Sequence, residues 1–413
     1  MDTQQVDSRR AVDELKELAE LTGGPGGARR VCWTEEWRNA REWLKGKLAE
    51  IDGVEVETDE AGNLWATAPG DSEDEVLIGG HMDSVPEGGW LDGSLNTIAG
   101  LEAMRVLAPQ RRPVTLRLVD WADEEGARFG RSLLGSSATA GSLDPDSVRG
   151  LTDRDGVALP DALAENGVDL DRMKESHDQL KNARAYIELH IEQGPVLERM
   201  GLPLGVVLGT FGVERHMVRF RGQHAHSGST PMDVRRDAFL AAAKSALAFR
   251  DDAASRDDVR ATTGIVNVNP AIVTAFNGWC ETSLDQRALD ADVLADMLQK
   301  AKEASEKAAS EEDVEVEWEK VWEIEPRPFD DDLIDMADEA VREVAGSSHR
   351  LASGPLHDAA EMAPLMPTVM LFAKSLRGLS HTKEEDTPEE DIDLSVQAVH
   401  RLAQKTMQWV GNR

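Results

Sequence analysis

Short apolar runs that alternate with amphipathic helical patterns constrain the fold of this chain most. We expect buried strands at residues 75–79, 114–121, 185–191 and 368–373, and helices at residues 11–21, 35–51, 95–107 and 391–410. Because strands separated by helices build a sheet covered on both faces, the pattern predicts an α/β fold with a mixed central sheet flanked by helices. The stretches 23–27 and 144–178 are rich in loop-forming residues.

The segment from about residue 205 to 326 has a different organisation. We expect strands at residues 206–220, 264–268, 279–288 and 314–324, and helices at 234–249 and 291–309. Several strands with two helices among them predict a separate α+β sandwich inserted into the first domain. The chain of 413 residues is long enough for both, since one core rarely grows past about 250–300 residues. The expected boundaries are 1–207, 208–326 and 327–413.

The charge balance excludes some classes of partner. The chain has 45 Lys and Arg against 78 Asp and Glu, a formal net charge of −33. This charge repels phosphates, so we expect neither nucleic acid nor a membrane as a partner. An acidic excess of this size fits either the solvated surface of a halophilic protein or a strongly acidic cytosolic enzyme.

Several features favour a cytoplasmic location. Only Cys32 and Cys280 are present, which excludes a disulfide framework and favours a reducing compartment. The amino terminus has no apolar core of signal-peptide type, and no run approaches the roughly 20 apolar residues of a membrane span.

Ionisable side chains follow three of the expected strands at the point where each strand ends. His81 and Asp83 follow the run 75–79, the pair Glu124 and Glu125 follows the run 114–121, and His190 lies at the end of AYIELHI. Open α/β sheets build their sites at the carboxyl ends of strands. We therefore expect these side chains to converge.

With Asp92 and His381, these residues supply what a two-metal hydrolase needs. His81, Asp92, Glu125, His190 and His381 are candidate ligands for two divalent cations, and Glu124 is the candidate general base that takes a proton from water. Asp83, two residues after His81, can hold the tautomer of that ring. Imidazole and carboxylate ligands without thiolate suit zinc by default, with manganese, cobalt or nickel as alternatives.

Each of these residues alone has an ordinary structural explanation. Asp92 precedes a glycine, which usually marks a turn, and adjacent glutamates are common on solvated helix faces. The interpretation depends on the combination and its order along the chain.

Long motifs resemble those of a known enzyme family. The chain is similar to the metal-dependent hydantoinase/carbamoylase branch of the aminoacylase and carboxypeptidase superfamily, which includes N-carbamoyl-L-amino acid hydrolases, β-ureidopropionases and allantoate amidohydrolases. The resemblance covers nearly the whole chain. It lies in GGHMDSVPEGGWLDGSLNTIAGLEA, ADEEGARFGRSLLGSSATAG, YIELHIEQGPVLE, GQHAHSGSTPMDVRRDA, SGPLHDAAEMAPLMPTVML and GLSHTKEED.

The resemblance implies a role for each motif residue. Asp92 would bridge two metal ions, with His81 and His190 on one ion, Glu125 and His381 on the other, and Glu124 activating water. The inserted domain would act as a lid and as the contact of a homodimer. His226 would stabilise the oxyanion of the tetrahedral intermediate, in relatives across the dimer interface. The substrate-binding positions would be Gln193, Thr274, Arg287, Gly354 and His357.

The chain departs from the family pattern around the expected substrate positions. Thr274 stands where relatives usually carry Asn, and Phe211 stands where they often carry a polar residue. The common Ser-Gly-Ala-Gly-His-Asp loop contains Pro355 and Leu356 in place of its Ala and second Gly. We therefore expect a small-molecule substrate that is bulkier or less polar than a carbamoyl amino acid.

The expected reaction is hydrolysis of a linear amide or ureido C–N bond in an N-carbamoyl-L-amino acid or a related ureido or N-acyl amino acid. An aminoacylase or dipeptidase is the alternative within the same class. A non-catalytic metal-binding protein on this fold is a third reading, which loss of Glu124 or of a ligand would mark; none is lost.

Overall fold

The computed structural model describes residues 6–413, which form two compact units. Residues 209–328 make up one, called here the inserted unit, and the residues before and after them make up the other, the main unit. The sequence places the inserted segment at 208–326.

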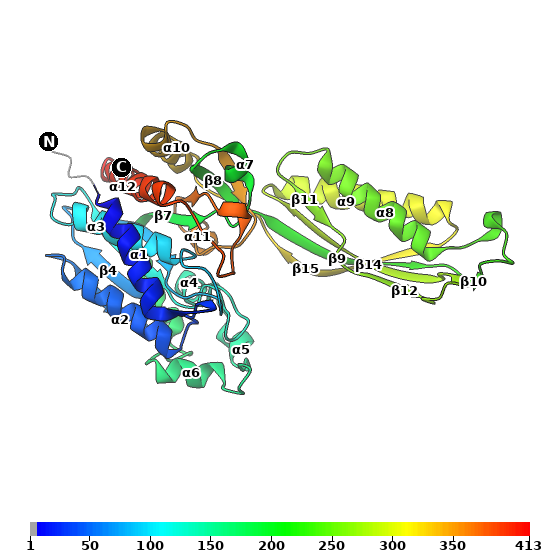
Figure 1. The fold of residues 1–413 in the computed structure, drawn as a ribbon, viewed down its shortest axis with the longest axis horizontal. Coiled ribbons are helices and arrows are strands. Elements are labelled where there is room, and N and C mark those ends of the chain that lie inside the picture. Colours follow the sequence, from blue (N-terminus) through cyan, green and yellow to red (C-terminus); the bar gives the residue numbers. More distant parts are fainter. Residues whose placement is uncertain (1–5) are drawn as a thin grey trace. The chain divides into compact units, whose positions relative to one another are not determined.

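The main unit is built on a mixed sheet (Figure 1). Four parallel neighbours, in the order β18-β7-β5-β6, form its centre. Antiparallel strands extend it on both sides, β4 and β3 beyond β6, and β8 beyond β18. The strand bounds are β3 (Glu55–Thr58), β4 (Leu64–Ala68), β5 (Glu75–His81), β6 (Thr115–Trp121), β7 (Ala183–Ile191), β8 (Leu204–Thr210), β16 (Arg327–Pro328), β17 (Arg350–Ser353) and β18 (Thr368–Ala373).

Helices flank this sheet, which confirms the predicted fold class. Helices α3, α10 and α12 contact strands of the sheet, and α1 packs on α2, α3 and α12. Because β5, β6, β7 and β18 are almost entirely buried, they read as continuous apolar runs in the sequence. The long helices are α1 (Ser8–Thr22), α2 (Glu35–Ala49), α3 (Ser94–Leu107), α10 (Asp331–Ala345) and α12 (Glu389–Gly411).

The stretch 144–178 was expected to be loop-rich, but it contains three short helices. Their few apolar side chains, such as Leu159 and Met173, bury themselves in a cluster with Trp33 and Trp37. Polar residues outnumber these apolar residues, so the sequence shows no clear helical periodicity there. The short elements of the main unit are β1 (Gly23–Gly24), β2 (Gly27–Ala28), α4 (Leu134–Ala140), α5 (Pro145–Val148), α6 (Leu159–Glu165), η1 (Met173–Leu180), α7 (Val196–Met200), α11 (Ala359–Met362) and η3 (Leu376–Gly378).

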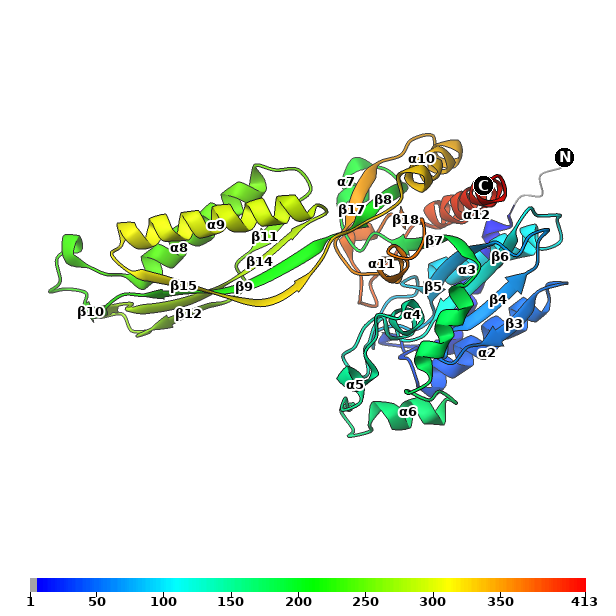
Figure 2. The ribbon, with the colours of Figure 1, turned by 180° about the vertical axis from the view of Figure 1, so that it is seen from behind.

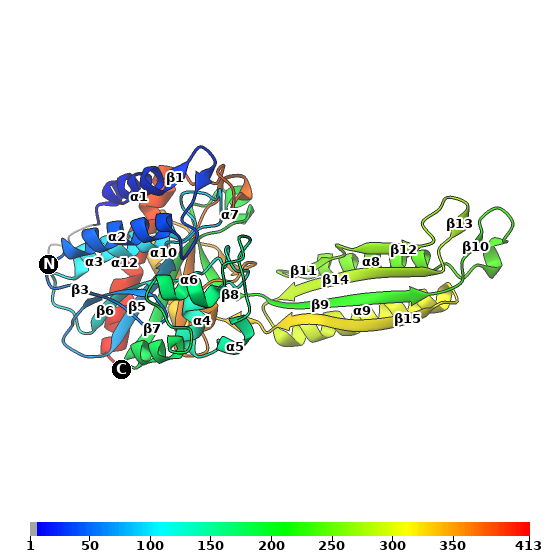
Figure 3. The same ribbon diagram turned by 90° about the horizontal axis from the view of Figure 1, so that it is seen from below.

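The inserted unit is an antiparallel sheet with two helices on one face (Figures 2 and 3). In β14 every second residue is buried, and Leu284 is among the residues that face the helices. The strands are β9 (Gly212–Arg221), β10 (Ala225–His226), β11 (Arg260–Thr262), β12 (Val266–Asn269), β13 (Ala275–Phe276), β14 (Trp279–Ala288) and β15 (Glu315–Ile324); the helices are η2 (Met232–Val234), α8 (Ala238–Ala254) and α9 (Ala291–Glu311).

Two elements near the start of the inserted unit differ from the sequence expectation. The single strand expected at 206–220 is two strands that are separated at Phe211, and the first of them, β8, joins the sheet of the main unit. Helix α8 begins at Ala238 because the Asp237 side chain accepts hydrogen bonds from the N–H groups of Phe239 and Leu240. Within residues 6–413, no helix has the length and apolar character that crossing a membrane requires.

Candidate metal centre and active site

The ends of adjacent parallel strands bring the predicted residues together. His81 is the last residue of β5, and His190 is the next to last residue of β7, which pairs with β5. Strand β6 pairs with β5 on its other side, and Glu124 follows three residues after β6. The side chains therefore meet at one edge of the sheet, as expected for an α/β protein.

Asp92 belongs to two groups of potential metal ligands. One group is His81, Asp92 and His190, and the other is Asp92, Glu125 and His381; within each group the ligand atoms lie within 4.8 Å of one another. Asp92 Oδ1 lies 3.6 Å from His81 Nε2 and 3.1 Å from His190 Nε2. Its other oxygen, Oδ2, lies 3.5 Å from His381 Nε2, which is 3.3 Å from Glu125 Oε2. The two oxygens of one carboxylate thus serve different groups.

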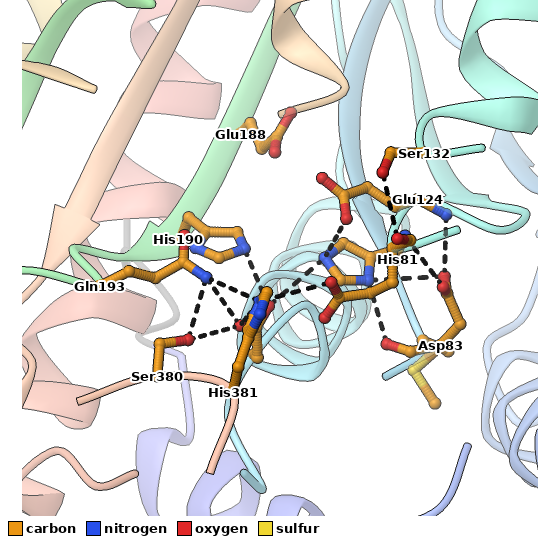
Figure 4. A network of polar contacts seen from close by, with 12 residues as sticks. His81, Asp83, Glu124, Ser132, Glu188, His190, Gln193, Ser380 and His381 are labelled. Atoms are coloured by element: carbon orange, nitrogen blue, oxygen red, sulfur yellow. Dashed lines mark hydrogen bonds and ion pairs between the residues drawn. The ribbon is translucent and has the colours of Figure 1, made fainter. Parts of the chain in front are cut away.

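The donor atoms fit a pair of divalent cations. His81 Nδ1 lies 3.1 Å from the carbonyl oxygen of Asp83, and His190 Nδ1 lies 2.9 Å from that of Ile191. Each ring therefore donates through Nδ1 and leaves the lone pair of Nε2 facing Asp92. Figure 4 shows the rings of His81 and His190 near Glu124, Gln193 and His381. Among the described residues, His81 Nε2 and Glu125 Oε1 are buried without a hydrogen-bond partner. Unpartnered nitrogen and oxygen donors of this kind suit a transition metal ion.

Asp83 links the end of β5 to the turn that carries both glutamates. Its Oδ1 accepts a hydrogen bond from the N–H of Glu124, and its Oδ2 accepts one from the N–H of Glu125, both at 3.2 Å. The same Oδ1 lies 3.5 Å from His81 Nδ1. One buried carboxylate thus orients a histidine and the two glutamates at the same time.

Glu124 lies beside the centre without belonging to either ligand group. Its Oε2 is 3.8 Å from His81 Nε2, and its side chain lines the adjacent cavity. Burial raises the pKa of Glu124 well above its ordinary value, and nearby His81 opposes this shift. Burial, followed by the charge of Asp92, also raises the pKa of Glu125. A carboxylate next to the ligands that is not itself needed as a ligand can accept a proton.

A cavity of about 250 Å³ opens beside these residues. Leu133, Pro355 and Leu356 give it an apolar wall, and none of the described residues that line it is Lys or Arg. Its lining consists of Asp92, Glu124, Glu125, Ser132, Leu133, His190, Gln193, Pro355, Leu356, His357 and His381.

The substrate residues expected in the main unit lie at this cavity, close to the ligands. Gln193 Nε2 donates to Asp92 Oδ2 at 2.9 Å and lies 3.3 Å from His381 Nε2. The ring of His357 lies 4.4 Å from that of His190, and its Nε2 is 2.9 Å from Ser353 Oγ. Gly354 directly precedes the cavity residue Pro355.

The remaining predicted residues belong to the inserted unit. His226 in β10 pairs with Ala275, and the N–H of Ser227 donates to the carbonyl oxygen of Thr274 at 2.8 Å, so His226 and Thr274 are neighbours. Arg287 lies at the other end of β14, where its Nε donates to Asp285 Oδ1 at 2.9 Å. Trp279, at the start of β14, and Arg287 are eight residues apart, which is roughly 27 Å at about 3.4 Å per residue.

Phe211 has a packing role. Its side chain is buried at the end of β9, and the guanidinium carbon of Arg260 lies 5.8 Å from the centre of its ring. Among the departures from the family pattern, only Pro355 and Leu356 line the cavity of the main unit.

Sequence reasoning missed several residues that contact the ligands. Glu385 is only 2% exposed, and its Oε1 accepts hydrogen bonds from the N–H groups of Leu91 and Asp92. Ser380 Oγ donates to Asp92 Oδ2 at 2.8 Å. Both flank His381 in GLSHTKEED, but the charged run KEED looks like a solvated surface segment. Arg30, which is fully buried behind the centre, lies in an unpatterned loop.

The chain is similar in sequence to enzymes of known function. It is 33% identical to the N-carbamoyl-L-amino acid amidohydrolase of Geobacillus stearothermophilus over 96% of its own length and 97% of that protein. It is also 33% identical to the allantoate amidohydrolase of Escherichia coli strain K12, with 93% and 94% covered.

Solved structures show the same relationship. A hydantoinase/carbamoylase family amidase from Burkholderia phymatum matches with a TM-score of 0.86 and 30% identity, over 99% of this chain and all of that chain (100%). The family profile described as peptidase family M20/M25/M40 matches residues 77–405. These findings confirm the resemblance seen in the motifs. The chain belongs to peptidase family M20/M25/M40 and is similar throughout its length to hydantoinase/carbamoylase amidases.

Proposed function

We propose that the chain is a metal-dependent amidohydrolase that cleaves a linear amide or ureido C–N bond, with an N-carbamoyl-L-amino acid or a related ureido or N-acyl amino acid as its substrate. The observation that carries this proposal is the position of Asp92. Its two oxygens face separate ligand groups, and Glu124 lies 3.8 Å from His81 Nε2 without belonging to either group. The names of the similar enzymes support the choice of substrate class.

The proposed ligands are His81 and His190 for one cation and Glu125 and His381 for the other, with Asp92 shared. Two cations held there would polarise the scissile carbonyl and make water easier to deprotonate. Zinc is the default expectation, and manganese, cobalt or nickel would suit the same donor atoms.

Glu124 is the proposed proton carrier. It takes a proton from the attacking water and delivers it to the leaving nitrogen as the C–N bond breaks. Asp83 assists because its carboxylate accepts a hydrogen bond from the N–H of Glu124 and so fixes the backbone there. The products are a carboxylic or carbamic acid and an amine, so the added water balances the reaction.

Substrate recognition in the main unit involves the apolar wall of the cavity. Leu133, Pro355 and Leu356 favour a hydrocarbon part of the substrate, whereas the described lining of the cavity offers no Lys or Arg for a carboxylate. We assign the carboxylate to Arg287, whose planar fork can bind both carboxylate oxygens. Gln193, Thr274, Gly354 and His357 remain the other predicted substrate residues.

We also propose a homodimer that forms through the inserted unit. His226 is exposed at one end of β14 and Arg287 lies near the other end, so one copy of this unit does not bring them together. In a dimer, a second copy can supply His226 as the donor to the oxyanion. Sedimentation equilibrium should give about twice the chain mass of 45.2 kDa. A monomer that hydrolyses substrate at the full rate would exclude this arrangement.

Replacement of Glu124 by Gln tests the central assignment. We expect turnover to fall by at least about 10³-fold, because the amide cannot accept the proton, while the chain still binds two divalent ions. Glu42→Gln on the exposed face of α2 is the matched control and should leave both properties unchanged. Near-normal turnover by Glu124→Gln would refute its role. A wild-type chain that binds two ions but hydrolyses nothing would instead support the non-catalytic reading.

A substrate panel separates the proposed activity from its alternative. N-carbamoyl, N-acyl and dipeptide derivatives of the same apolar amino acids should be compared by kcat/KM. We expect carbamoyl or acyl derivatives with apolar side chains to be the best substrates. A preference for dipeptides would assign the chain to the dipeptidase alternative.

A further inference from the structure

Arg30 carries a buried charge directly behind the proposed metal centre. Its side chain is completely buried, and among residues 6–413 no carboxylate lies within ion-pair distance of it. Its three nitrogens donate instead to neutral oxygens: Nε to the carbonyl of Met82 at 2.8 Å, Nη2 to Ser94 Oγ at 2.7 Å, and Nη1 to Thr22 Oγ1 at 3.4 Å. A buried charge without an ion pair is costly, so this position calls for an explanation.

The three acceptors belong to three different segments. Thr22 ends α1, Met82 lies between His81 and Asp83, and Ser94 begins α3, two residues after Asp92. The backbone of Arg30 adds two bonds, because it donates to Ser84 Oγ at 3.1 Å and accepts from the N–H of Ser84 at 3.0 Å. Arg30 thus ties the segment that carries His81 to the turn that carries Asp92.

Glu385 holds the same turn through other atoms. Its Oε1 accepts hydrogen bonds from the N–H groups of Leu91 and Asp92, at 3.1 and 2.9 Å. Its Oε2 accepts from Ser380 Oγ at 3.1 Å, next to His381. A Cβ on Gly89 would collide with the Glu385 carboxylate, so the chain closes tightly over it. Glu385 thus ties the turn of Asp92 to the segment that carries His381.

We propose that Arg30 and Glu385 are positioning residues that clamp residues 91–94 from two sides through hydrogen bonds and so hold Asp92 between the two metal positions. Arg30 connects this turn to the His81 side of the centre, and Glu385 connects it to the His381 side. The inference rests on the proposed metal centre and adds residues that contact neither the substrate nor a cation. The clamp depends on the planar guanidinium of Arg30, which donates to three acceptors at once, and on the carboxylate oxygens of Glu385, which accept hydrogen bonds.

The clamp predicts different losses for the two residues. Without the Arg30 guanidinium, the distance from His81 to Asp92 should no longer be fixed. The metal affinity of the group His81, Asp92 and His190 should then fall more than that of the other group. Without Glu385, the metal affinity of the group Asp92, Glu125 and His381 should fall more. Loss of a group that orients ligands typically lowers metal affinity by 10- to 100-fold.

The test measures metal binding by the full chain after removal of metal with a chelator. Mn²⁺ is titrated into the wild type and into Arg30→Met, Arg30→Lys, Glu385→Ala and Glu385→Gln, by calorimetry and by electron paramagnetic resonance. The wild type should bind two Mn²⁺ per chain as a spin-coupled pair. In Arg30→Met and Glu385→Ala, one of the two affinities should fall by at least about 10-fold, and signals of isolated Mn²⁺ should appear at equal loading.

Conservative and control variants separate positioning from general stability. Glu385→Gln keeps an acceptor for the two N–H groups and should recover most of the affinity, whereas Arg30→Lys keeps the charge without the fork and should recover little. Arg112 is the matched control, because it is also buried and donates to the carbonyls of Leu107, Ala108 and Pro69, away from the ligands. Arg112→Met should lower the melting temperature without changing either affinity.

The outcomes distinguish this inference from the function on which it rests. If the wild type binds a coupled pair and the Arg30→Met and Glu385→Ala variants bind it equally well, the clamp is refuted alone. The same conclusion follows if Arg112→Met weakens binding as much as Arg30→Met. If the wild type binds no Mn²⁺, the proposed metal centre and the clamp are refuted together.

Discussion

Four non-glycine residues around the cavity have left-handed backbone conformations. They are Asp123 (φ 59°), Leu133 (φ 57°), Gln193 (φ 56°) and His381 (φ 57°). Such residues cost of order 1 kcal/mol or more each and persist where the surroundings hold them. Here hydrogen bonds hold the neighbouring chain: Asp83 accepts from the N–H groups of Glu124 and Glu125, next to Asp123, and the Gln193 side chain donates to Asp92. The position of the functional side chains therefore depends on residues that do not react.

Asp83 allows a direct test at the residue scale. In Asp83→Asn one of the two acceptor oxygens becomes an NH₂ group, which faces the N–H of Glu124 or Glu125 instead of accepting from it. We expect kcat/KM to fall by about 10²-fold and metal affinity to fall by 10- to 100-fold. Kinetics and metal titration measure both.

A second buried aspartate provides the control for Asp83. Asp59 also accepts two backbone N–H bonds, from Ala61 and Asn63, each at 2.9 Å, and contacts none of the proposed ligands. Asp59→Asn should lower stability and leave the metal affinity unchanged. Equal metal affinities in Asp83→Asn and the wild type would contradict the orienting role of Asp83.

At the scale of elements, two helical glycines differ only in their surroundings. A Cβ on Gly100 in α3 would lie 2.5 Å from Leu118 Cδ1 and 3.2 Å from Ile78 Cγ2, whereas a Cβ on Gly46 in α2 would meet nothing within 4 Å. Gly100 therefore lets α3 approach β5 and β6 closely. Gly46 only lowers the helical propensity of α2.

Substitution by alanine at the two positions should change the stability of the chain in opposite directions. Gly100→Ala should destabilise the chain by about 1–3 kcal/mol through overpacking. Gly46→Ala should stabilise it by about 0.5–1 kcal/mol, because alanine is the better helix former. Urea unfolding followed by circular dichroism measures both. A stabilising effect of Gly100→Ala would show that α3 does not pack as tightly as described.

The sequence predicted most elements with long apolar or amphipathic runs. Strands β5, β6, β7 and β18 and helices α1, α2, α3 and α12 were predicted, and they determine the edge where the site lies. Strand β4 and helix α10 were missed, although β4 is almost entirely buried and α10 has a buried face. Strand β3 was missed because its residues are exposed or half-buried, and α5 and α6 were missed because they are short.

The same distinction applies to the site. Residues that end strands, such as His81 and His190, could be located from the pattern. Arg30, Ser380 and Glu385 could not, because their contacts reach segments far away in the sequence. The roles of Thr274 and Arg287 came from the resemblance alone, and that of His226 came mainly from it, since their positions carry no strong pattern.

At the scale of the whole molecule, the charge excess cannot be neutralised internally. If every one of the 45 Lys and Arg were paired with one of the 78 Asp and Glu, 78 − 45 = 33 carboxylates would still have no partner. Many ion pairs among the described residues are also exposed on both sides and contribute little each. Mutual repulsion of the remaining carboxylates therefore opposes the folded state, and its range is set by the salt concentration.

This repulsion predicts that salt stabilises the chain. Raising NaCl from 0.05 M to 1 M shortens the screening length from more than about 10 Å to about 3 Å, which removes repulsion between distant carboxylates. Salt also weakens the exposed ion pairs, but their small individual contributions make this loss the lesser effect. We expect the melting temperature, measured by scanning calorimetry, to rise steadily over this range. The reverse-charge variants Glu50→Lys and Asp52→Lys, at exposed positions after α2, should raise it at low salt and reduce its dependence on NaCl. A melting temperature that is constant or falls with NaCl would show that the ion pairs outweigh the net charge.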